Sequence, residues 1–159
     1  IIAALMKHSD SISKKSAERI VSESETGARA PHGLSGKFLL GVAAIWSLFQ
    51  IWYASPLPFI LKFGVLNNTE ARSIHLAFSI FLAYLAFPAT RRSPRQQIPI
   101  LDWVFATTGA ICAVYLFIFY VDLSDRMGLP TTTDLVISVC GIVLLLEATR
   151  RALGPPLMV

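Results

Sequence analysis

Charged residues are scarce in this sequence, where Asp, Glu, Lys and Arg make up 15% of 159 residues. Soluble globular proteins usually carry about 25%. Hydrophobic residues account for 54% of the chain instead, and the mean hydropathy is +0.60. This balance argues against a water-soluble domain and indicates that lipid surrounds most of the chain.

Cysteine is also rare, because Cys112 and Cys140 are the only two. Both lie in apolar runs, so we expect small buried hydrophobic side chains rather than a disulfide framework. The sequence has no GxxxxGK[ST] loop, which argues against an ATP-driven motor. His75 is the only histidine in an apolar run, so a haem with two histidine ligands cannot be built within this chain. We therefore predict no enzymatic activity and no cofactor.

The clearest predicted membrane span lies within residues 129–157. Thr131-x-x-Asp134 has the spacing of a capping box, in which each side chain accepts a hydrogen bond from the other residue's backbone N–H. An uninterrupted apolar run follows over residues 135–146. Residues 131–149 form a helix about 28 Å long at 1.5 Å per residue, close to the ~30 Å thickness of a bilayer core.

Three other apolar runs are predicted to be spans, over residues 38–55, 71–87 and 100–121. With the span over residues 131–149, the fold class is an all-α membrane protein of four transmembrane helices. The expected domains are a flexible polar cytoplasmic tail (1–36), a four-helix transmembrane region (37–151) and the start of a truncated further segment (152–159). Since the chain begins with Ile1 and not Met, we expect it to be part of a longer protein.

Lysine and arginine are distributed unevenly between the predicted loops. Eleven of the fourteen lie in the tail and at Lys37, which directly follows it, in the loop 88–99 or at the end of the last span. Only Lys62, Arg72 and Arg126 lie on the other side. Cytoplasmic loops carry the excess of positive charge, so both termini are predicted to be cytoplasmic.

Polar residues in or near spans are candidates for function. Glu147 lies three and four residues before Arg150 and Arg151, so we expect ion pairs on one helical face. A coupling role of Glu147 in transport is the alternative. The small residues of Gly109-x-x-x-Ala113 predict a face for close helix packing.

The other candidates have simpler interpretations. Asp134 is expected to cap its helix, and Asp102 to lie at the positive end of a helix dipole. Arg72 and His75 are one turn apart, and we expect interface anchors rather than ligands. Gln50 is expected to make a hydrogen bond between helices.

The stretch PTTTDLVISVCGIVLLLEATRRALGPPL, residues 130–157, resembles the permeases of tripartite ATP-independent periplasmic (TRAP) transporters. It is most similar to the TAXI type, in which small and large membrane subunits are fused. Shorter stretches also resemble these permeases, at residues 72–76, Phe87-Pro88, residues 98–103, and SLFQIWYA followed by Pro56. The likeness covers roughly residues 36–157.

The resemblance implies a sodium-coupled symporter in the bacterial inner membrane that takes up organic acids. A periplasmic solute-binding protein delivers the substrate in this family. The four-helix region would correspond to the small subunit, which acts as a scaffold beside the large membrane subunit or the downstream part of the same chain. The substrate and sodium sites belong to the large subunit, so none is expected here.

Two other functions remain compatible with the residues. The first is a small membrane anchoring or interaction protein without transport function. The second is a membrane-bound redox subunit. The residues alone do not separate the anchor from the scaffold, and the resemblance favours the scaffold.

Overall fold

The computed structural model describes residues 28–29, 33–90 and 97–153, and these residues form helices without any strand. The predicted tail up to residue 27 and the predicted segment from residue 154 lie outside the described residues. The helices are α2 (Leu34–Ala54), α3 (Leu57–Leu61), α4 (Asn68–Ala86), α5 (Ile100–Ile118), α6 (Tyr120–Asp125) and α7 (Thr132–Leu153).

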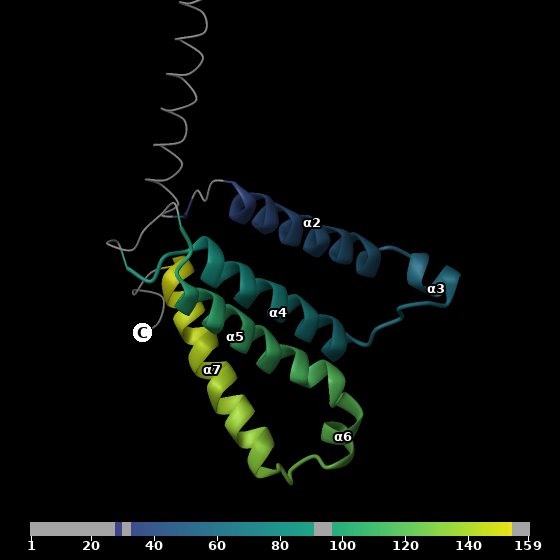
Figure 1. Ribbon diagram of the computed structural model, residues 1–159. Helices are drawn as coiled ribbons and strands as arrows, with labels where there is room; N and C mark the ends of the chain where they lie inside the picture. Colours follow the sequence, from purple (N-terminus) through teal and green to yellow (C-terminus); the bar gives the residue numbers. More distant parts are fainter. Residues whose placement is uncertain (1–27, 30–32, 91–96, 154–159) are drawn as a thin grey trace, which may run out of the picture.

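The four long helices run alternately in opposite directions (Figure 1). Helix α4 packs against α2, α5 and α7, and α5 also packs against α7. One end of the bundle therefore combines the starts of α2 and α5 with the ends of α4 and α7.

Three helices, α2, α5 and α7, are long and apolar enough to cross a membrane. This confirms an all-helical protein compatible with a membrane location. The predicted second span also forms a helix, α4, which is not among these three and has Glu70, Arg72 and His75 in its first turns. Arg72 and His75 are exposed.

Helix α4 supplies most of the core. Ile80, Tyr84 and Leu85 are at most 2% exposed, and they belong to one buried cluster with Ala106 of α5 and Ala148 of α7. Helix α2 is the opposite case, since none of its residues is buried. Leu40, Ile45 and Leu48 are among its many exposed apolar side chains. In water this surface would be costly, whereas lipid chains can cover it.

Local signals set the helix boundaries. Ser55 adopts an extended conformation before Pro56, as residues preceding proline prefer, so α2 ends at Ala54. Helix α5 ends at Ile118, because Phe119 is not helical and separates it from α6. The predicted span ended three residues later, at residue 121. Asn67 and Glu70 form a capping box at the start of α4, with N···O distances of 2.8 and 2.9 Å.

Gly109 lets α4 and α5 approach closely. A Cβ atom at this position would lie 2.6 Å from Cγ2 of Ile80. Ala113, one turn further along α5, is also buried. The predicted small-residue packing face is thus confirmed.

We expect Gly109→Ala to destabilise the bundle by about 1–3 kcal/mol, because Ile80 is buried and its branched side chain has little freedom to move. Thermal unfolding in detergent, followed by circular dichroism, measures the effect. Gly41→Ala is the matched control, since a Cβ atom there meets nothing within 4 Å. The control should gain stability from helix propensity. Equal unfolding temperatures of the two variants would contradict the packing argument.

Candidate functional site

Five ionised side chains meet at the end of the bundle where α2 and α5 begin. We call Arg29, Asp102, Glu147, Arg150 and Arg151 the charge cluster. Asp102 lies in the first turn of α5 and is 4% exposed. One of its carboxylate oxygens accepts a hydrogen bond from Arg29 Nη2, and the other from Arg151 Nη1 at 2.7 Å. Asp102 lies at the start of its helix, as predicted, and it is also a buried bridge between two arginines, which was not predicted.

Glu147 holds the two arginines that follow it on α7. Its carboxylate accepts hydrogen bonds from Nε and Nη2 of Arg150, both at 2.7 Å, and from Arg151 Nε at 2.8 Å. The ion pairs predicted from the spacing are confirmed. Arg150 Nη2 also donates to the carbonyl of Ala89 at 3.1 Å, which ties α7 to the chain after α4.

Arg29 closes the C-terminal end of α4. The last four carbonyl groups of a helix have no partner within it. Here the Arg29 backbone N–H donates to Ala86 at 2.7 Å, and Nη1 donates to the carbonyls of Tyr84 and Leu85 at 3.3 and 3.4 Å. Arg29 was expected only as one cation of a polar tail. No local spacing points to its role, since 73 residues separate it from Asp102.

Tyr84 connects α4 to α7 beside the charge cluster. The Arg151 guanidinium lies 4.6 Å from the centre of its ring, a cation–π contact. Its hydroxyl donates to the carbonyl of Leu144 at 2.9 Å. Tyr84 was also missed from the sequence, because an aromatic residue in an apolar run looks like ordinary core.

The opposite end of the bundle has a second polar group, around Asp134. The predicted capping box is confirmed, with N···O distances of 2.8 Å from Thr131 N and 3.3 Å from Asp134 N. Asp134 also accepts hydrogen bonds from the Tyr115 hydroxyl and from Arg126 Nη2, the latter at 3.2 Å. It therefore joins α5, the α6–α7 connection and α7.

The remaining candidates are not part of either group. Arg72 and His75 are exposed on α4. His75 Nδ1 accepts a hydrogen bond from Trp46 Nε1 at 3.3 Å, so this contact joins α2 to α4. Gln50, expected to make such a bond, lies on the exposed side of α2.

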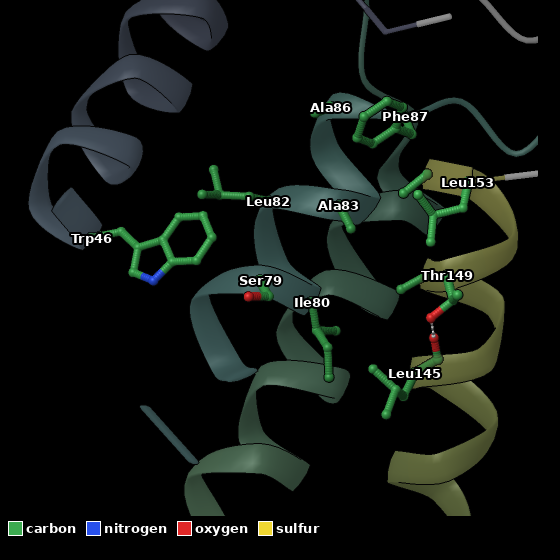
Figure 2. A pocket seen from close by; sticks show the side chains of 12 residues that line it. Trp46, Ser79, Ile80, Leu82, Ala83, Ala86, Phe87, Leu145, Thr149 and Leu153 are labelled. Carbon is green, nitrogen blue, oxygen red and sulfur yellow. Dashed lines mark hydrogen bonds between the residues drawn. The ribbon is translucent and has the colours of Figure 1, made fainter. Parts of the chain in front are cut away.

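An apolar groove of about 380 Å³ lies over α4, between α2 and α7. Figure 2 shows Trp46 of α2 on one side and Leu145, Thr149 and Leu153 of α7 on the other. The hydroxyls of Ser79 and Thr149 both donate to carbonyls of their own helices, at 2.9 Å. Hydrocarbon suits this groove, whereas a charged substrate would find no counter-charge among its lining residues.

Cys112 and Cys140 are half-buried free cysteines on α5 and α7. Within residues 28–29, 33–90 and 97–153, no group of three or more His, Cys, Asp and Glu side chains is placed to hold a metal ion. Asp102, Asp134 and Glu147 instead pair with arginines near the helix ends. No protein-family model, curated protein or solved structure matches this chain.

We expect Asp102→Asn to destabilise the protein by about 3–5 kcal/mol, because it removes the negative charge shared by two buried arginines. Arg126→Gln breaks the half-exposed pair at the opposite end and should cost about 1 kcal/mol or less. Thermal unfolding in the same detergent compares the two variants. An Asp102→Asn protein as stable as Arg126→Gln would show that the cluster does not hold the bundle together.

Proposed function

We propose that this chain is the membrane scaffold of a TRAP-type transporter, a sodium-coupled, binding-protein-dependent secondary importer of organic acids in the bacterial inner membrane. It corresponds in this proposal to the small-subunit-like region of a TAXI-type permease. The observation that carries the scaffold role is the placement of charge. At one end of the bundle Asp102 of α5 pairs with Arg151 of α7 and with Arg29, and at the opposite end Asp134 of α7 pairs with Arg126.

The pairing of charges at the ends of the bundle favours a scaffold role over a transport pathway through these helices. Secondary transporters bind substrates and ions near the bilayer midplane, at broken helices with free backbone groups. Here α5 and α7 run unbroken between their polar ends, and Glu147 is fully engaged by Arg150 and Arg151. Such a bundle can hold a fixed shape beside a moving partner. A coupling role of Glu147 is less compatible with this geometry.

In the proposed topology α4 is the fourth span. Its 19 residues extend about 28 Å, and its polar first turns lie at the membrane surface. The positive-inside rule then places the charge cluster and both termini on the cytoplasmic side. The Asp134 group and the capping box of Asn67 lie on the periplasmic side. Helix α3, with Phe59 and Ile60 exposed, lies in the membrane interface.

The partners follow from the resemblance. The large membrane subunit, or the downstream part of the same chain, carries the substrate and sodium sites. A periplasmic solute-binding protein docks on the outer face. The alternative, a membrane anchor without transport function, is equally compatible with paired charges at the helix ends. Co-purification of a periplasmic solute-binding protein with the native protein distinguishes the two.

Both termini are expected to be cytoplasmic, so a cysteine placed at position 93 should resist a membrane-impermeant maleimide in intact cells and react after lysis. The background replaces Cys112 and Cys140 with alanine. Val65→Cys, an exposed position on the proposed periplasmic side, is the control and should react in intact cells. Labelling of position 93 from outside would reverse the topology.

Deletion of residues 36–149 from the full transporter is expected to abolish sodium-dependent uptake of organic acids, because the partner loses its support in the bilayer. Uptake of radiolabelled carboxylates by cells containing the binding protein measures this. Immunoblots must show the deleted protein in the membrane at the normal level. Gly41→Ala, which meets nothing within 4 Å, should retain uptake. Uptake that survives the deletion would rule out the scaffold role.

A further inference from the structure

The charge cluster contains more positive than negative charge. Three guanidinium groups, those of Arg29, Arg150 and Arg151, face two carboxylates, those of Asp102 and Glu147. The side chain of Arg29 is fully buried, and its Nε has no acceptor among the described residues. A buried charge is costly unless an opposite charge compensates it. The cluster thus lacks one negative charge.

Helix dipoles do not supply this charge. The ends of α4 and α7 are negative, but the starts of α2 and α5 are positive, and all four meet at this end of the bundle. Two positive and two negative helix ends of similar size largely cancel. The compensating charge must therefore come from outside the described helices.

The cluster is accessible along one edge. The side chain of Arg150 is 35% exposed, whereas those of Arg151 and Asp102 are nearly covered. Nε and Nη2 of Arg150 already donate to Glu147 and Ala89, so Nη1 is the nitrogen that can donate to a further oxygen, such as that of a phosphate. Leu146 and Leu153, on the same part of α7, are exposed apolar side chains. The accessible edge therefore combines a phosphate-binding group with surface suited to hydrocarbon.

We propose that the charge cluster binds an anionic phospholipid, whose phosphate contacts Arg150 while an acyl chain covers Leu146, one turn closer to the middle of α7. A phosphodiester carries one negative charge, which equals the surplus of the cluster. The cluster lies where apolar helices end, and headgroups are found at this level of a bilayer. Free phosphate would satisfy Arg150 but leave the apolar surface uncovered. The proposal requires a membrane location and is independent of any transport role.

The test is a titration of the purified, delipidated protein in a neutral detergent, followed by native mass spectrometry. Phosphatidylglycerol, which is anionic, should bind roughly tenfold more tightly than zwitterionic phosphatidylcholine, the effect of one charge-assisted interaction. Excess inorganic phosphate should not displace it. Equal affinity for the two lipids, or displacement by inorganic phosphate, would overturn the proposal.

Two variants should change the affinity in opposite directions. Arg150→Gln removes the accessible guanidinium and should weaken phosphatidylglycerol binding roughly tenfold. Glu147→Gln frees Arg150 and raises the surplus to two positive charges, so it should strengthen binding several-fold. A merely damaged fold would weaken binding in both variants.

Arg126→Gln is the matched control. Arg126 is 34% exposed and ion-paired like Arg150, but it lies at the opposite end of the bundle. Its substitution should leave phosphatidylglycerol binding unchanged. Equal effects of Arg126→Gln and Arg150→Gln would show that the lipid binds by overall charge alone, which contradicts a site at the cluster.

Discussion

The carboxylate of Asp102 is the contact on which this end of the bundle depends. Its two oxygens pair with Arg29, from the chain before α2, and with Arg151, from the end of α7. A buried carboxylate is stable only when such partners replace the water it has lost. Through Arg29 the same carboxylate also fixes the group that satisfies three carbonyls of α4. Asp102 thus links α5 to α7 through Arg151, and to the chain before α2 and the end of α4 through Arg29.

The long helices differ in how much of their surface is buried by neighbouring helices, and they differ in hydropathy as well. Helix α4 contributes the most buried residues of the described helices, because three neighbours pack against it, and it is the one long helix that is not apolar enough to count as a candidate span. Helix α2 has no buried residue, and it is long and apolar enough to cross a membrane. Average hydropathy therefore identifies the outer helices of such a bundle better than the central one.

Interactions between residues close in sequence were predictable, and distant ones were not. The pairing of Glu147 with Arg150 and Arg151 follows from helical spacing, as does the capping box of Thr131 and Asp134. The capping box of Asn67 and Glu70 has the same spacing and could have been found. The partners of Asp102 are 73 and 49 residues away. A pairing of this kind depends on how the helices assemble, and no local pattern encodes it.

The contacts of Arg29 also bear on the order of events during synthesis. Arg29 emerges before α2, but its partners on α4 and α5 are made later, and the arginine that shares Asp102 with it is near the end of α7. Glu147 and Arg151 can pair as soon as α7 forms its last turns, whereas Arg29 must wait for a long loop to close. The upstream end of α2 therefore stays untethered until α5 has been made. The contacts around Asp102 are complete only when α7 has been made as well.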